Sequence, residues 1–181
     1  MSDQTTTVPV ERLPTGIPGI DGITLGGLPV GRNTLVTGVA GAGKTVFAVQ
    51  FLAEGIRRFG QSGVFVTLGE TPADLRRNAA ALGFDVARWE SEDSWRFVDA
   101  TPDPDEDVVT GRFDFSGLGA RILAAVDALD ATRVAIDSIS AAFGRFEDQR
   151  SVRWALYGLL ETLKGSGVTV VLTAEGTDDE L

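Results

Sequence analysis

The 181-residue sequence contains neither cysteine nor histidine. Without cysteine the chain forms no disulfide and carries no thiol chemistry. Without histidine it lacks the usual general base of neutral pH and the usual nitrogen ligand of zinc. Any proton transfer at an active site of this chain therefore falls to carboxylates, which are the obvious remaining general bases.

Lysine is scarce as well, since only Lys44 and Lys164 occur. Asp and Glu total 26 against 16 Lys and Arg, which gives a formal net charge of −10. This balance argues against a mainly electrostatic hold on nucleic acid. No apolar run approaches the length of a membrane span, and residues 1–10 lack the basic and apolar regions of a secretory signal. We therefore expect a cytoplasmic protein with neither membrane nor nucleic acid as partner.

What the sequence does contain is a glycine-rich motif that holds one of the two lysines. Residues 38–45 read GVAGAGKT and match G-x-x-x-x-G-K-[ST], the phosphate-binding P-loop. A strand-like run precedes the motif and a helix-like run follows it, so unpaired helix N–H groups would point at the phosphates. The residues predicted to hold a nucleotide such as ATP are Gly38, Gly41, Ala42, Gly43, Lys44, Thr45 and Val46. Lys44 would neutralise phosphate oxygens, and the Thr45 hydroxyl would ligate Mg²⁺.

Apolar, β-branched runs alternate with helix-like segments along the chain. The runs predicted as strands are residues 34–37, 64–68, 95–99, 133–137 and 168–173. This alternation predicts an α/β fold, with a mostly parallel five-stranded sheet and helices on both faces. The clearest helix start is Thr71, with Pro72 in the first helical position and Asp74 closing a capping box.

The chain length predicts a single domain. We predict a core over residues 11–176, between a flexible tail at 1–10 and an acidic tail at 177–181. Within the core, residues 138–149 and the acidic run 103–107 are predicted to be loops. The acidic run is interpreted as a solvated surface, because no metal-ligand spacing is discernible in it.

Polar residues follow the predicted strands at the edge where parallel sheets bind their ligands. Asp137 ends an apolar strand in the Walker B pattern, and its carboxylate is expected to hold Mg²⁺, mainly through water. Glu70 is the candidate base that polarises an attacking water. The alternative for Glu70 is an acid that favours a helix start through the helix macrodipole. Weaker candidates, each with an ordinary strand or surface role as the alternative, are Thr173, Ser138, Arg145 and Arg150.

Taken in order, these motifs resemble a KaiC-type domain of the RecA superfamily of P-loop NTPases. The segments that carry the resemblance are 14–21, 26–32, 38–45, 64–72, 99–104 and 134–138. On composition alone, the Gly- and Pro-rich segments 14–21 and 26–31 have the alternative of an ordinary surface loop. The resemblance implies a RecA-like ATPase core that binds ATP and Mg²⁺. It also implies a ring-shaped homo-oligomer in which nucleotide lies between neighbouring subunits.

The sequence departs from this family in two ways. KaiC-type domains usually carry two adjacent glutamates where this chain has Gly69 and Glu70, and the missing first one is usually credited with activating water. Family members also continue into further strands whose basic residues reach a neighbour's nucleotide, and these have no counterpart in the sequence. The resemblance thus implies slow or absent hydrolysis, or that Glu70 serves alone. It does not support a circadian or autokinase role, because the second, phosphorylated domain is also missing.

Three functions compete on these grounds. The first is a slow or vestigial Mg-dependent ATPase that uses ATP and ADP as switch ligands. The second is a nucleotide-binding regulatory or interaction module without turnover, which acts with a protein partner. The third is a RecA-like DNA recombinase, which the acidic charge and the missing basic, aromatic-rich loops make the least supported.

Overall fold

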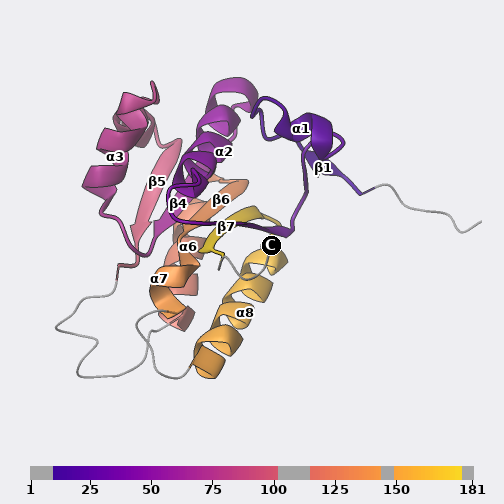
Figure 1. Ribbon diagram of the computed structural model, residues 1–181. Helices are drawn as coiled ribbons and strands as arrows, with labels where there is room; N and C mark the ends of the chain where they lie inside the picture. The colour runs from indigo at the N-terminus through magenta and orange to yellow at the C-terminus, as the bar shows by residue number, and fades with distance from the viewer. Residues whose placement is uncertain (1–9, 102–114, 144–148, 177–181) are drawn as a thin grey trace, which may run out of the picture.

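The computed structural model describes residues 10–101, 115–143 and 149–176 (Figure 1). Residues 1–9 of the predicted tail 1–10, the predicted tail 177–181, the acidic run 103–107 and Arg145 lie outside these residues. The elements are β1 (Arg12–Leu13), α1 (Ile20–Ile23), β2 (Leu28–Pro29), β3 (Asn33–Gly38), α2 (Lys44–Phe59), β4 (Gly63–Thr67), α3 (Pro72–Ala81), α4 (Val86–Ser91), β5 (Trp95–Asp99), α6 (Phe115–Leu129), β6 (Arg133–Asp137), α7 (Ile139–Phe143), α8 (Gln149–Gly165) and β7 (Thr169–Glu175).

The main sheet has five strands in the order β3-β7-β6-β4-β5. Every neighbouring pair in it is parallel, which confirms the predicted α/β fold. The central strands β4 and β6 are buried throughout, as expected of strands covered on both faces. A separate antiparallel pair, β1 with β2, was not predicted, because two residues per strand are too few to show a periodic pattern.

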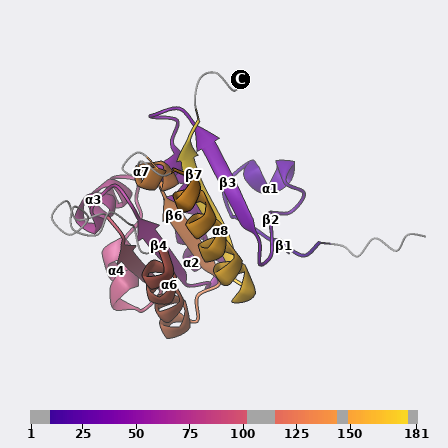
Figure 2. The same ribbon diagram turned by 90° about the horizontal axis from the view of Figure 1, so that it is seen from below.

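Helices cover both faces of this sheet (Figures 1 and 2). The helices α2, α3 and α4 pack on one face around an apolar cluster that includes Phe51, Phe65 and Trp95. The helices α6, α7 and α8 pack on the other face around a second cluster that includes Ile122 and Leu163. In Figure 2, α8 crosses in front of the sheet beside α6. The inner strands β4 and β6 are therefore covered on both faces, whereas the edge strand β3 is partly exposed.

The connection after β6 differs from its prediction, whereas the one after β4 agrees with it. The loop predicted over residues 138–149 is wrong in part, because α7 occupies Ile139–Phe143 and α8 already begins at Gln149. The apolar Ile139 is buried in the α6–α8 cluster, and this long-range contact is what favours the short helix. The predicted helix start at Thr71 is confirmed, since its hydroxyl oxygen accepts a hydrogen bond from the Asp74 backbone N–H at 3.2 Å.

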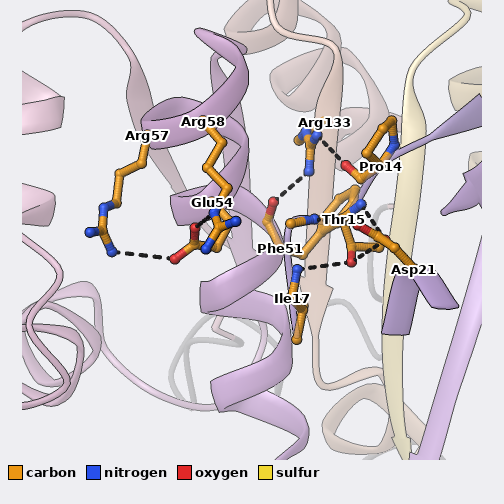
Figure 3. A network of polar contacts seen from close by, with 10 residues as sticks. Pro14, Thr15, Ile17, Asp21, Phe51, Glu54, Arg57, Arg58 and Arg133 are labelled. Atoms are coloured by element: carbon orange, nitrogen blue, oxygen red, sulfur yellow. Dashed lines mark hydrogen bonds and ion pairs between the residues drawn. The ribbon is translucent and has the colours of Figure 1, made fainter. Parts of the chain in front are cut away.

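A polar network lies at the amino-terminal end of β6, whereas Asp137 lies at the carboxyl-terminal end of the same strand (Figure 3). Arg133, the first residue of β6, is fully buried. Its guanidinium donates to the carbonyls of Phe51 at 2.9 Å and Pro14 at 2.7 Å, and to the Gln61 side chain at 2.6 Å. It also lies over the rings of Phe51 and Phe59. One side chain thus joins the sheet, the helix α2 and the segment before α1.

The segment before α1 folds around Asp21. The Asp21 carboxylate accepts hydrogen bonds from the backbone N–H groups of Thr15 and Gly16 at 2.8 and 3.0 Å and from the Thr15 hydroxyl at 2.6 Å. Burial alone would raise the pKa of Asp21, but the bonds from Thr15 and Gly16 and the charge of Arg133 lower it. Thr15, Gly16 and Ile17 are buried. The alternative of an ordinary surface loop is therefore wrong for this part of 14–21.

Candidate functional site

The P-loop connects the end of β3 to the start of α2. Gly41 and Gly43 have φ angles of 79° and 86°, a left-handed conformation that only glycine adopts without strain. Gly43 is the N-cap of α2, and no side chain caps this helix end. Residues 39–43 are exposed. The first backbone N–H groups of a 16-residue helix therefore face solvent, in the arrangement that favours an anion.

Lys44, the first residue of α2, is half-buried beside this loop. Its ammonium donates hydrogen bonds to the backbone carbonyls of Gly38 and Val39, both at 2.9 Å. The lysine side chain therefore folds back over the loop instead of extending away from it. The charge of Lys44 therefore lies beside the loop that is predicted to hold phosphate.

Asp137 ends β6 and is buried, with 6% of its surface exposed. One carboxylate oxygen, Oδ2, accepts a hydrogen bond from the Thr45 hydroxyl at 2.8 Å. The other, Oδ1, accepts one from the Thr173 hydroxyl. The Ser138 hydroxyl donates a longer hydrogen bond, of 3.4 Å, to the backbone carbonyl of Thr173 and does not contact Asp137 in this way. The structure thus brings together the two predicted metal ligands, Thr45 and Asp137, with Thr173 beside them.

Glu70 follows β4, the strand next to β6. The Thr67 hydroxyl donates to its backbone carbonyl, and the Asn78 amide donates to its carboxylate at 3.2 Å. Although Glu70 is exposed, partial burial of its carboxylate raises its pKa, and the negative charges of Asp137 and Asp74 raise it further. The hydrogen bond from Asn78 acts in the opposite direction. The negative charge of Asp137 therefore acts on the Glu70 carboxylate.

Sequence reasoning missed Thr67 and Asn78. Thr67 had the signal of a polar residue at a strand end, where Asp137 is its register partner across β4 and β6. Asn78 had no comparable signal, because only the packing of α3 turns its amide toward Glu70. Arg150 is exposed at the start of α8 and takes no part in the hydrogen bonds around Asp137.

The motif order and this geometry agree with a comparison against known families. A family model described as "ATPase: KaiC" matches residues 13–180. The chain belongs to the KaiC family of ATPases. Its sheet and P-loop are accordingly those of a nucleotide-binding ATPase domain of the RecA superfamily.

Curated KaiC proteins are also similar to this chain. "Circadian clock protein KaiC3" of Synechocystis sp. is 47% identical over 171 residues, which are 94% of this chain and 34% of that protein. "Circadian clock oscillator protein KaiC" of Parasynechococcus marenigrum is 46% identical over 174 residues, 96% of this chain and 34% of that protein. The protein of the same name from Thermosynechococcus vestitus is 44% identical over 170 residues, 94% and 33% of the two chains. This KaiC-family chain spans about a third of the length of these relatives.

The described residues of this KaiC-family domain contain no helix long and apolar enough to pass through a bilayer. Within the same residues, no group of three or more carboxylates gathers as a metal cage. At the ends of the strands, the Asp137 carboxylate has the hydroxyls of Thr45 and Thr173 as its hydrogen-bond partners.

Proposed function

We propose that this KaiC-family domain binds ATP together with Mg²⁺ and uses the nucleotide as a regulatory switch, with slow hydrolysis. The observation that carries the proposal is the hydrogen bond between the Thr45 hydroxyl and the Asp137 carboxylate, at 2.8 Å. It joins the end of the P-loop to the end of a neighbouring strand. These are the two oxygen donors that a P-loop site offers to Mg²⁺.

The residues of the site suit a magnesium nucleotide. Mg²⁺ keeps several waters and takes few protein oxygens, so one hydroxyl and one carboxylate fit its preference. When bound, the metal would neutralise charge on the phosphate oxygens. Lys44 would turn from the carbonyls of Gly38 and Val39 to those phosphates, while the N–H groups from Gly41 to Val46 would cradle them.

Glu70 is the carboxylate we assign to the attacking water. Burial and the nearby charge of Asp137 raise the pKa of Glu70, which strengthens it as a base, and the Asn78 amide donates a hydrogen bond to its carboxylate. Position 69 is where the resemblance places a second glutamate. An added Cβ at Gly69 would meet only the Ala141 Cβ, at 3.7 Å, so a side chain has room there. We infer that ATP turnover is slow because position 69 lacks a carboxylate. A glutamate side chain would fit at this position without a steric clash.

Self-assembly, or binding to a protein partner, is part of the same proposal. Both β3 and β5 are edge strands of the five-stranded sheet, and each pairs on one side only among the described residues. Unpaired strand edges favour association. A ring with nucleotide between subunits would bring a neighbour's cation to the phosphates, an effect worth about 10³–10⁵ in rate where an arginine finger is used.

The test is phosphate release from Mg-ATP, measured beside ATP affinity by calorimetry. We expect Lys44→Ala to weaken ATP binding at least about tenfold. Glu70→Gln should bind ATP normally and release phosphate at least about tenfold more slowly. Gly69→Glu should release phosphate faster than the unmodified chain, because it supplies the missing carboxylate. Normal ATP binding by Lys44→Ala would refute the site itself.

The second candidate function, a binding module without turnover, is favoured by one observation: glycine stands at position 69. It predicts equal, background phosphate release by the unmodified chain and by Glu70→Gln. Light scattering with and without ATP tests assembly in either case. A strictly monomeric mass under both conditions would remove the intersubunit site.

A further inference from the structure

The outer face of α8 carries a row of exposed side chains that the nucleotide site does not use. Trp154 and Tyr157 are 71% and 59% exposed, among the largest apolar exposures in the described residues. Their rings meet edge to face, with centroids 6.3 Å apart. Two aromatic rings on one helix face, open to solvent, are unusual on a surface with no partner.

Charged residues extend this aromatic pair at both ends. Arg150 lies four residues before Trp154, and Glu161 lies four residues after Tyr157; both are exposed. At 100° per residue the four side chains fall within an arc of about 60°. They lie opposite the helix positions that enter the core, such as Leu159. We call Arg150, Trp154, Tyr157 and Glu161 the α8 seam.

The spacing of the α8 seam is four, three and four residues, which is the spacing of the contact positions in a helix pair. The seam is also symmetric about its midpoint in the kind of residue it carries. If the helix direction is reversed, Trp154 and Tyr157 exchange places, and Arg150 takes the place of Glu161. A surface with this property is complementary to a second copy of itself in the antiparallel direction, as a two-fold interface requires.

We propose that α8 is the dimerisation surface of this chain and pairs antiparallel with α8 of a second copy. In that arrangement Trp154 of each copy packs against Tyr157 of the other. At both ends Arg150 lies opposite the other copy's Glu161. Glu161 also contacts Lys164 of its own helix at 3.3 Å, but this exposed pair is weak and leaves carboxylate oxygens for an arginine. The inference does not rest on the proposed function.

A second copy suits this surface because the α8 seam is complementary to itself in charge, although the rest of the chain is not. The chain has a net charge of −10, so two copies repel each other over most of their surfaces. The α8 seam supplies one cation and one anion per copy and so forms two attractive pairs. A single helix seam lies at the small end of interface sizes, so we expect dissociation on the order of micromolar.

Charge reversal tests the pairing by sedimentation velocity over a concentration series, without nucleotide. Arg150→Glu and Glu161→Arg should each raise the dissociation constant at least about tenfold, because each places like charges opposite one another at both ends. The double variant Arg150→Glu/Glu161→Arg should restore it. The two single variants, mixed in equal amounts, should also associate, since their ends are then complementary. A control reversal on another surface helix, Arg88→Glu, should change nothing.

Fluorescence gives a second readout that folding defects do not imitate. Of the three tryptophans, Trp89 and Trp95 are buried, so Trp154 alone should shift its emission to shorter wavelength as dimers form. Tyr157→Ala should abolish that shift and leave the melting temperature within a few degrees of the parent chain's. The proposal is overturned if the chain stays monomeric at several hundred micromolar, or if association needs ATP. It is equally overturned if the double reversal and the mixture fail to restore pairing.

Discussion

Thr45 and Asp137 lie 92 residues apart in the sequence and are joined by a 2.8 Å hydrogen bond. This bond fixes the first turn of α2 against the end of β6. Because Thr173 holds the second carboxylate oxygen, Asp137 cannot rotate away from the P-loop without breaking a contact. The position that the proposed function gives to Mg²⁺ is therefore set by the folded chain, which lowers the entropic cost of arranging ligands on binding.

Asp137→Asn should abolish the magnesium dependence of ATP binding. The amide keeps the size of the carboxylate but loses the charge that attracts the metal, while the P-loop contacts to phosphate remain. Calorimetry in Mg²⁺ and in EDTA should then give equal affinities for this variant and unequal ones for the unmodified chain. Thr173→Ser, which retains the hydroxyl, is the matched control and should keep the dependence. Persistent magnesium dependence in Asp137→Asn would show that the metal binds elsewhere.

The rate of phosphate release should fall at acidic pH, and substitutions around Glu70 should change the pH at which this acidic limb of the profile lies. A base works only when deprotonated, so anything that raises the pKa of Glu70 moves this limb to higher pH. Asn78→Ala removes the bond that lowers the pKa and should shift the limb upward. Asp74→Asn removes a negative charge that raises it and should shift the limb downward. If neither variant moves the limb, Glu70 is not the base.

The same pKa also predicts a small effect on stability. A carboxyl group whose pKa is raised on folding binds its proton more tightly in the folded state. This tighter proton binding stabilises the folded state fully below the ordinary pKa of 4.5, and the stabilisation is lost as the pH rises through the pKa of Glu70 in the folded state. Glu70→Gln should therefore gain stability relative to the parent chain at pH 7 and lose that gain at pH 4, in urea unfolding at both values.

Arg133 should be one of the most costly arginines to remove. Arg133→Ala leaves the carbonyls of Phe51 and Pro14 and the Gln61 side chain without their donor and opens a cavity between two aromatic rings. We expect a loss of about 3 kcal/mol or more in the free energy of unfolding. Arg96→Ala, at the start of β5, removes an ion pair to the exposed Asp93 and should cost within about 0.5 kcal/mol.

Burial does not neutralise the guanidinium of Arg133. Loss of water lowers the pKa of Arg133 to about 10, and the charge of Asp21 opposes that shift. The side chain therefore remains a cation at pH 7. Arg133→Lys keeps a charge but not the planar fork, and its stability should fall between those of the parent chain and Arg133→Ala. Equal stability of all three proteins would mean that the network of Figure 3 contributes nothing.

Two helical glycines should respond to alanine with opposite signs. Alanine is the better helix former by about 0.5–1 kcal/mol, and Gly158→Ala in α8 meets nothing within 4 Å, so it should stabilise by that amount. At Gly55 in α2 an added Cβ would lie 2.6 Å from the Cδ and Nε atoms of Arg133, which its hydrogen bonds hold in place. Gly55→Ala should therefore destabilise by about 1–3 kcal/mol. Urea titrations at low micromolar protein measure both, and a stabilised Gly55→Ala would show that Arg133 moves aside freely.

The site was more predictable from the sequence than the connections were. A P-loop and a Walker B strand are local patterns, and parallel strands bring their ends to one edge, so Thr45, Glu70 and Asp137 could be placed together. The short helices α4 and α7 have too few residues for a periodic signal. Arg133 could not be assigned a role, because its partners lie 72 to 119 residues away and nothing local marks them.

The strand β6 begins with Arg133, the cation of a buried polar network, and ends with Asp137, the carboxylate that we propose as a magnesium ligand. The three residues between them, Val134, Ala135 and Ile136, are at most 1% exposed and separate the two apolar clusters. Every position of the strand therefore has either a buried apolar side chain or a polar side chain held by specific hydrogen bonds. We therefore expect substitutions at these five residues to be poorly tolerated. Natural drift in this chain should concentrate on helix surfaces and spare the strand at the centre of its sheet.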